Sequence, residues 1–190
     1  MARIYVVQHA EKVPAAGDPP LTTRGCRQAR STGAWLSRQG ITAVFSSPLL
    51  RARQTAQCIA TEAGDLSIGI DDRLRERMNW DGSLPWEQFL ADWTRTIHDR
   101  DFTPRIGDSS RAAAQRMLSF FREVAGEPIA AVTHGGVTTD FLRTLLGDDG
   151  VPEEFRNRGI PPCAVTILDD MTVIETAGTA HLRADQLRPT

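Results

Sequence analysis

The sequence predicts an α/β protein, a three-layer α/β/α sandwich whose sheet is mostly parallel. Three observations carry this prediction: short β-branched or apolar runs alternate with longer amphipathic segments, two of those runs end directly in a histidine, and one long segment interrupts the alternation. Neither an internal repeat nor a linker divides the 190 residues. We therefore expect a single domain over residues 1–190.

The first β-α unit begins near the amino terminus. Residues 3–8 form a β-branched and aromatic run that is too short for a helix and indicates a buried strand, with His9 at its carboxyl end. After a turn-rich stretch, Thr22 is suited to cap a helix whose small and apolar residues repeat at helical spacing until Gly40.

The second unit repeats this pattern. Residues 41–45 predict another short strand. Ser47 is then the predicted N-cap of a helix that has Pro48 at its first position and extends to about residue 63.

The second half of the chain continues the alternation. An apolar stripe over residues 112–124 predicts an amphipathic helix, and a break precedes the apolar strand 129–133. His134 ends that strand, and the two glycines after it open a further helix. Residues 164–168 and 172–176 are expected to pair as a hairpin that supplies an antiparallel edge, and the last dozen residues to form a solvated tail.

One segment, residues 74–105, departs from the pattern. It holds Trp80, Trp86 and Trp93 among acidic and arginine residues, and it indicates an inserted helical excursion. Because such excursions often roof a site in α/β folds, we expect a lid. Packing under that lid is the default role of the three tryptophans, so they are not assigned to the site.

Charge and composition exclude several classes of function. The chain has 22 Lys+Arg against 24 Asp+Glu, a net charge of −2, so no basic excess favours nucleic acid or an anionic membrane as partner. No apolar run reaches the length of a membrane span, and the first residues do not resemble a signal peptide, which predicts a cytoplasmic protein. The three cysteines, Cys26, Cys58 and Cys163, lack the spacing of a disulfide framework or a metal site.

Three residues are expected to form a phosphoryl-binding pocket. Ligands of open α/β sheets collect at the carboxyl ends of strands, where His9 and His134 lie. Arg51 falls in the first turn of the second helix, where its charge opposes the helix dipole. A guanidinium, helix-start N–H groups and two imidazoles suit a phosphoryl group, and one imidazole could be a nucleophile.

Five short motifs follow one another along the chain: Gln8-His9-Ala10-Glu11, Pro20-Leu21-Thr22-x-x-Gly25, Ser46-Ser47-Pro48-x-x-Arg51-Ala52, Leu74-Arg75-Glu76 and Val132-Thr133-His134-Gly135-Gly136. In this order they resemble the motifs of the histidine phosphatase superfamily, which includes phosphoglycerate-mutase-like enzymes. The resemblance covers the chain from residue 3 to about residue 176.

The resemblance implies a phosphohistidine mechanism without metal or other cofactor. His9 would attack phosphorus, and Glu76 would protonate the leaving oxygen and later activate water. Arg51 and His134 would hold the phosphoryl oxygens. For Glu76 a solvated position in a run of charged residues is a real competing interpretation.

One departure from the family pattern concerns the start of the first motif. The family reads Arg-His-Gly where this chain has Gln8-His9-Ala10, so a permanent charge is missing from the expected phosphate-binding set. Gln8 is still assigned to phosphate binding. Lys12, three residues after His9, is a candidate replacement for the missing cation, and a solvated loop lysine is an equal alternative.

The function that these residues predict is hydrolysis of a small phosphorylated metabolite. The family's cofactor-dependent mutases are longer, so the length favours a phosphatase. Two alternatives stay open: a pseudophosphatase that binds a phosphorylated ligand with weak or no turnover, and a protein phosphohistidine phosphatase. The sequence does not set the oligomeric state, and a homodimer is left open.

Overall fold

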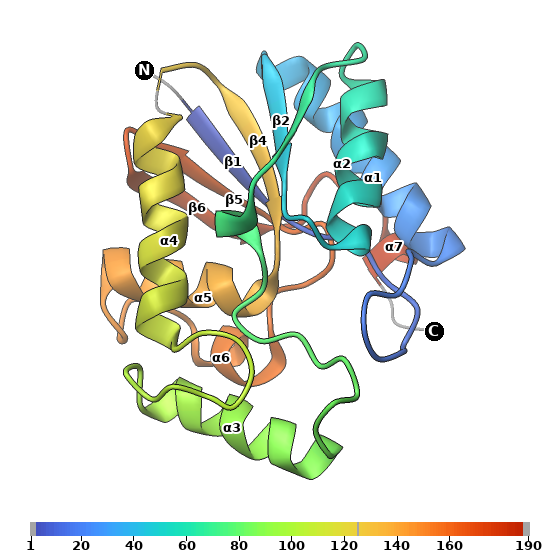
Figure 1. Ribbon diagram of the computed structural model, residues 1–190. Helices are drawn as coiled ribbons and strands as arrows, with labels where there is room; N and C mark the ends of the chain where they lie inside the picture. Colours follow the sequence, from blue (N-terminus) through green and yellow to red (C-terminus); the bar gives the residue numbers. More distant parts are fainter. Residues whose placement is uncertain (1–2, 125, 188–190) are drawn as a thin grey trace.

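The computed structural model describes residues 3–124 and 126–187. Its centre is a six-stranded sheet in the order β3-β2-β4-β1-β5-β6 (Figure 1). The strands are β1 Arg3–Gln8, β2 Ala43–Ser46, β3 Ile68–Ile70, β4 Ile129–Thr133, β5 Val165–Asp169 and β6 Thr172–Gly178.

The sheet is parallel from β3 to β1 and antiparallel at its other edge. β2 pairs in parallel with β3 and β4, and β1 with β4, whereas β5 runs antiparallel to β1 and to β6. Asp170 and Met171 join β5 to β6 with φ angles of 47° and 62°, the left-handed backbone that tight hairpins require. The predicted α/β fold with an antiparallel hairpin edge is confirmed.

Helices cover both faces of the sheet, because alternate strand residues point to opposite sides. Ile4 and Val6 of β1 pack with α4 and α5, and Tyr5 and Val7 pack with α1 and α2. The helices are α1 Thr23–Leu36, α2 Leu50–Glu62, α3 Trp86–His98, α4 Ser110–Glu123, α5 Gly135–Leu146, α6 Glu153–Arg158 and α7 Ala184–Leu187, with 3₁₀ turns at Ser37–Gln39 and Asp72–Leu74.

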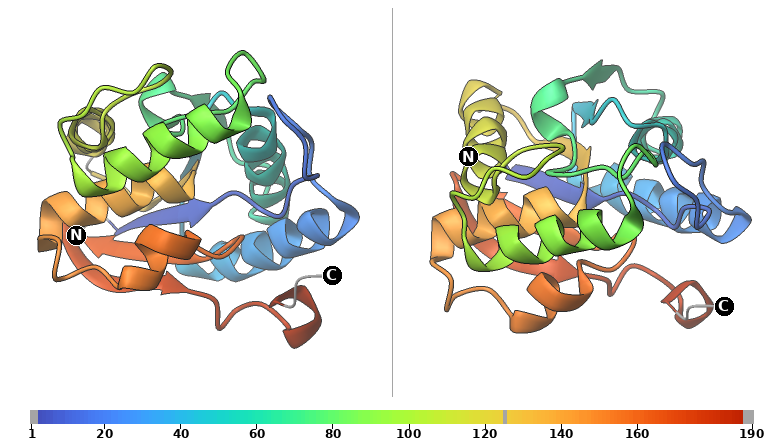
Figure 2. Two further views of the ribbon diagram at one scale, coloured as in Figure 1. Left: turned by 90° about the horizontal axis from the view of Figure 1, so that it is seen from below. Right: turned by 60° about the horizontal axis from the view of Figure 1, so that its bottom comes forward.

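Helix α3 covers neither face of the sheet. It lies at the bottom of Figure 1, beyond the carboxyl end of β1, and the view from below in Figure 2 shows it nearer the viewer than that strand and to one side of its tip. Residues 75–85 and 99–109 connect it to the rest of the fold. The predicted excursion is thus a helix placed where α/β proteins bind ligands.

The start of α2 differs from the prediction. The helix begins at Leu50, and the carboxylate of Asp18 accepts the Leu50 N–H at 2.7 and 2.8 Å, whereas Ser47 does not cap it. The Ser47 hydroxyl lies 2.7 Å from His134 Nε2 instead. The prediction of Ser47 as N-cap is wrong because a distant acid supplies the cap and a distant histidine engages the serine.

The prediction of a solvated tail is also wrong for the described part of that tail. Leu182 and Gln186 are buried, and Gln186 Nε2 donates to Ser31 Oγ of α1 at 2.9 Å. Residues 188–190 lie outside the described residues. Strand β3 and helix α6 were not predicted, since three and six residues are too few to give a periodic signal. None of the described helices has the length and apolar character to cross a membrane.

Candidate active site

A cavity of about 610 Å³ opens at the carboxyl edge of the sheet. His9 follows β1, Arg51 lies in the first turn of α2, and Glu76 follows the 3₁₀ turn, and all three line it. His134 does not line the cavity but lies next to His9, and the two ring centroids are 5.2 Å apart. Four of the five predicted site residues therefore meet at one place.

His9 is held as a neutral imidazole. Its Nδ1 lies 2.8 Å from the Ala10 carbonyl oxygen, so Nδ1 carries the proton and Nε2 keeps its lone pair. Burial, and next the charge of Arg51, lower the pKa of His9 from 6.5 to about 3. At neutral pH this ring is therefore uncharged, with a free lone pair on Nε2.

His134 is fully buried and oriented by Ser47. Burial, and next His9 and Arg51, hold its pKa well below 6.5. Ser47 Oγ accepts the Leu49 N–H at 3.3 Å and lies 2.7 Å from His134 Nε2, in a bond whose donor depends on the tautomer of the imidazole. His134 Nδ1 is buried without a hydrogen-bond partner among the described residues, so in the tautomer in which Ser47 donates to Nε2 it is a free N–H donor.

Arg51 is a buried cation with donors to spare. Its Nη2 donates to Asn79 Oδ1 at 3.0 Å, and its Nη1 lies 3.6 Å from the Asp18 carboxylate. Nε and Nη1 make no hydrogen bond within the described chain, although the residue is only 4% exposed. These two atoms are available to an anion in the cavity.

Glu76 is fixed by backbone N–H groups. Its carboxylate accepts from Arg77 N at 2.7 Å, Val137 N at 2.8 Å and Gly136 N at 3.1 Å. The last two belong to the first turn of α5, where negative charge is favoured. Gly136 is required here, because a Cβ at that position would lie 2.6 Å from Glu76 Oε1.

Lys12 lines the cavity, whereas Gln8 does not. Gln8 is buried beside Gly135, outside the cavity lining, and its Oε1 has no partner in the described chain. Lys12 lines the cavity, and burial followed by repulsion from Arg51 lowers its pKa. The cavity thus contains two cations, Arg51 and Lys12.

Aromatic side chains of the excursion form one wall of the cavity. Trp80, Trp86, Phe89 and Trp93 form a continuous row with ring-centroid separations of 4.9, 5.5 and 6.1 Å. The tryptophans were expected only to pack under the lid, so this wall was not predicted. The clustering of three tryptophans within residues 74–105 was the feature of the sequence that could have indicated it.

Other residues of the site gave no signal in the sequence. Asp18 and Asn79 both contact Arg51, and Ser47 orients His134. Their partners come from distant parts of the chain, so the contacts exist only in the folded protein. In the described part of the chain, no group of three or more His, Cys, Asp or Glu side chains is arranged to hold a metal ion.

The fold and the paired histidines are those of a histidine phosphatase. The chain belongs to the histidine phosphatase superfamily (branch 1), whose family model matches residues 4–172. It is 32% identical over 208 aligned positions to the probable phosphoglycerate mutase GpmB of Yersinia pestis, covering 96% of this chain and 95% of that protein. The predicted family and enzyme class are confirmed.

Solved structures show the same fold. A mycobacterial glucosyl-3-phosphoglycerate phosphatase with inorganic phosphate is 22% identical, with a TM-score of 0.75 over 96% of this chain and all of that one. A phosphoserine phosphatase mutant of Entamoeba histolytica, in complex with phosphoserine, is 22% identical, with a TM-score of 0.72 over 96% of this chain and all of that one.

Proposed function

We propose that this chain hydrolyses small phosphomonoesters through a phosphohistidine on His9 Nε2. The carrying observation is the state of His9, which is neutral, fixed at Nδ1 and placed beside a cation in an accessible cavity. In the first step the Nε2 lone pair attacks phosphorus and the ester P–O bond breaks. In the second step water cleaves the P–N bond, which releases inorganic phosphate and free His9.

Arg51 and His134 are suited to stabilise the phosphoryl group during transfer. Charge spreads over the three equatorial oxygens in a loose transition state. Arg51 offers two unpartnered N–H donors, and His134 offers a buried Nδ1–H. Because these donors are fixed before substrate arrives, they do not have to reorganise during the reaction.

Glu76 is suited to proton transfer, and its contacts support the second step most strongly. A carboxylate that already accepts three backbone N–H bonds stays in place as an acceptor. That arrangement fits the removal of a proton from the attacking water. Protonation of the leaving oxygen is the other role that the family resemblance gives it.

Lys12, rather than Gln8, is our candidate for the second cation of the phosphate site. Lys12 lines the cavity, and its charge acts on His9, whereas Gln8 is buried against α5. An ammonium can supply the missing charge, although not the paired donors of a guanidinium. Gln8 stays a candidate contact through its amide at the edge of the site.

The substrate class that the cavity favours is a phosphomonoester with a flat, apolar organic part. We propose that residues 74–105 act as the lid, and its aromatic row offers stacking surface beyond the His9 end. The phosphatases of similar fold, for glucosyl-3-phosphoglycerate and phosphoserine, indicate small phosphorylated metabolites in general. The aromatic lining makes an apolar ester the better fit here.

A phosphoglycerate mutase is the second candidate, because a relative with 32% identity has that name. A mutase must retain its phosphohistidine until it is passed back to a substrate hydroxyl. The apolar wall offers few partners for the hydroxyl and carboxylate of phosphoglycerate. An assay for conversion of 3- to 2-phosphoglycerate, with 2,3-bisphosphoglycerate present, separates the two candidates.

A pseudophosphatase and a protein phosphohistidine phosphatase are two further candidate functions of the same site. The first would bind phosphate esters without turnover, and the second would need a site open enough to admit a protein.

The cysteines at positions 26, 58 and 163 are free, in keeping with a cytoplasmic location. A homodimer is left open.

A metal-free hydrolysis panel on wild type and His9→Ala tests the proposal. We expect wild type to release inorganic phosphate from 1-naphthyl phosphate in the presence of EDTA. His9→Ala should lose at least about 10³-fold in kcat, as for removal of other covalent nucleophiles. Equal turnover by the two proteins would refute the mechanism, and a rate restored only by a divalent ion would refute metal independence.

A further inference from the structure

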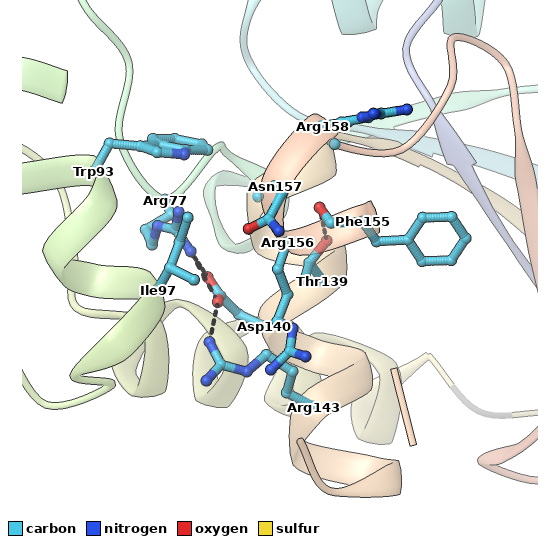
Figure 3. A pocket seen from close by; sticks show the side chains of 12 residues that line it. Arg77, Trp93, Ile97, Thr139, Asp140, Arg143, Phe155, Arg156, Asn157 and Arg158 are labelled. Carbon is cyan, nitrogen blue, oxygen red and sulfur yellow. Dashed lines mark hydrogen bonds and ion pairs between the residues drawn. The ribbon is translucent and has the colours of Figure 1, made fainter. Parts of the chain in front are cut away.

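A second cavity, of about 190 Å³, borders the first, and Trp93 lines both. It lies between α3, α5, α6 and Arg77 (Figure 3). Neither His9, Arg51 nor Glu76 lines it. It is therefore a separate compartment from the place where phosphoryl transfer is proposed.

The charge of this cavity is predominantly positive. Its lining contains Arg77, Arg143, Arg156 and Arg158 but a single acid, Asp140. Arg77 pairs with Asp140 at 2.8 Å, and Arg143 pairs at 2.8 Å with Asp148, which does not line the cavity. Arg156 and Arg158 make no ion pair with any residue that the structure describes.

Two arginine nitrogens in this cavity lack acceptors. Arg77 is 2% exposed, with its guanidinium 4.2 Å from the Trp93 ring centroid, and its Nε is buried without a partner. Arg156 Nε is likewise buried and has no acceptor in the described chain. Buried donors without acceptors are rare in folded proteins, and a bound anion would satisfy them.

Figure 3 narrows the location of a ligand. Arg158 and Phe155 are directed away from Asp140, whereas Arg77, Arg143 and Arg156 are directed toward the space around it. Two guanidinium groups, of Arg77 and Arg143, therefore lie against the Asp140 carboxylate, and Arg156 adds a third from another segment of the chain to the same cavity. A compact anion next to that carboxylate would complete the charge balance.

We propose that this arginine cavity binds a small oxyanion, a phosphate or a carboxylate, independently of the reacting phosphoryl group. Its volume is large enough for a tetrahedral anion, and guanidinium groups bind such oxygens in pairs. A divalent cation would meet net positive charge and is excluded by it. An occupied site would hold Arg77 and Trp93, which adjoin Glu76 and the His9 cavity.

Equilibrium dialysis with radiolabelled inorganic phosphate tests this proposal on the full chain. We expect wild type to bind two phosphates per chain. Arg156→Gln should weaken the second site by about ten-fold and leave the first, whereas Arg51→Gln should do the reverse. Arg156→Gln should keep its turnover of 1-naphthyl phosphate, and Arg38→Gln, at an exposed arginine remote from both cavities, should bind as wild type does.

Two results would overturn the proposal. One is a single phosphate per chain in wild type, lost in Arg51→Gln. The other is a second phosphate whose affinity is equal in wild type and Arg156→Gln, which would place it elsewhere. Should thermal melting show that Arg156→Gln is unfolded, Arg156→Lys keeps the charge but removes Nε, and an unchanged second site there would also contradict the proposal. Because phosphate binding is measured without turnover, failure of the proposed mechanism would not alter these results.

Discussion

The two cavities on either side of Trp93 contain similar groups in opposite arrangements. In the His9 cavity the acid, Glu76, is bound by backbone N–H groups, and Arg51 keeps two nitrogens, Nε and Nη1, without a hydrogen bond in the described chain. In the arginine cavity the acids pair directly with arginines, and Asp140 lies between them. Chemistry requires a neutral nucleophile in a positive field, whereas binding requires only an excess of positive charge.

Burial has opposite consequences for the titratable groups of the two cavities. It lowers the pKa of His9 to about 3 and raises that of Asp140 to about 6. At neutral pH His9 is therefore uncharged and Asp140 is ionised. The first state suits attack on phosphorus, and the second balances part of the arginine charge.

Among the phosphate-binding groups of the His9 cavity, Arg51 should give the largest loss of activity when it is replaced. Arg51→Gln removes the charge and the free donors, and we expect kcat/KM for an aryl phosphate to fall by about 10²–10³. Arg53→Gln, at an exposed position on the same helix, is the matched control and should have little effect. A loss below three-fold in Arg51→Gln would mean that this guanidinium does not contact the phosphoryl group.

A second prediction concerns which residue, Lys12 or Gln8, supplies the second phosphate-binding group beside Arg51. If Lys12 supplies it, Lys12→Ala should weaken vanadate inhibition by about ten-fold, the loss of one charged hydrogen bond. Gln8→Arg should then give no gain, because a like charge is already present. Tighter inhibition in Gln8→Arg, by about 1–3 kcal/mol, with an unchanged Lys12→Ala would assign the position to Gln8 instead.

The aromatic wall can be tested by comparing two substrates. Trp86→Ala should raise KM for 1-naphthyl phosphate by about five- to ten-fold, since stacking area is lost, and should change KM for glycerol phosphate little. Leu90→Ala is the control, because Leu90 lies exposed on the same helix outside the cavity lining. A parallel loss for both substrates would show that Trp86 supports the fold rather than the ester.

The depressed pKa of His9 should be visible in stability. The unfolded histidine takes up a proton near pH 6.5 and the folded one near pH 3, so the free energy of unfolding should fall as pH falls below 6.5. His9→Gln removes this contribution, so its Tm should drop less than that of wild type between pH 7.5 and 5, by a few degrees. Parallel curves for the two proteins would contradict the assigned pKa.

The elements that the sequence predicted best are those with local causes. Residues 129–133 and 3–8 are apolar runs of strand length, and both form the predicted strands. His9, Arg51 and His134 could be placed at strand ends or helix starts, so their convergence followed from the parallel sheet.

What the sequence could not predict depends on distant partners. Ser47 hydrogen-bonds His134, 87 positions away, and thereby loses the capping role that its local context indicated. Gln186 hydrogen-bonds to Ser31 of α1, which lies more than 150 positions earlier in the chain. The same applies to the arginine cavity, because its four arginines lie on three segments with no common motif.

Trapping the covalent intermediate tests the phosphohistidine mechanism most directly. Wild-type protein mixed briefly with ³²P-labelled aryl phosphate and quenched in base should retain label that is stable to base and released by acid. Peptide mapping should place that label on His9, and His9→Ala should retain none. Label on any other residue, or full turnover with no label retained at His9, would contradict the mechanism.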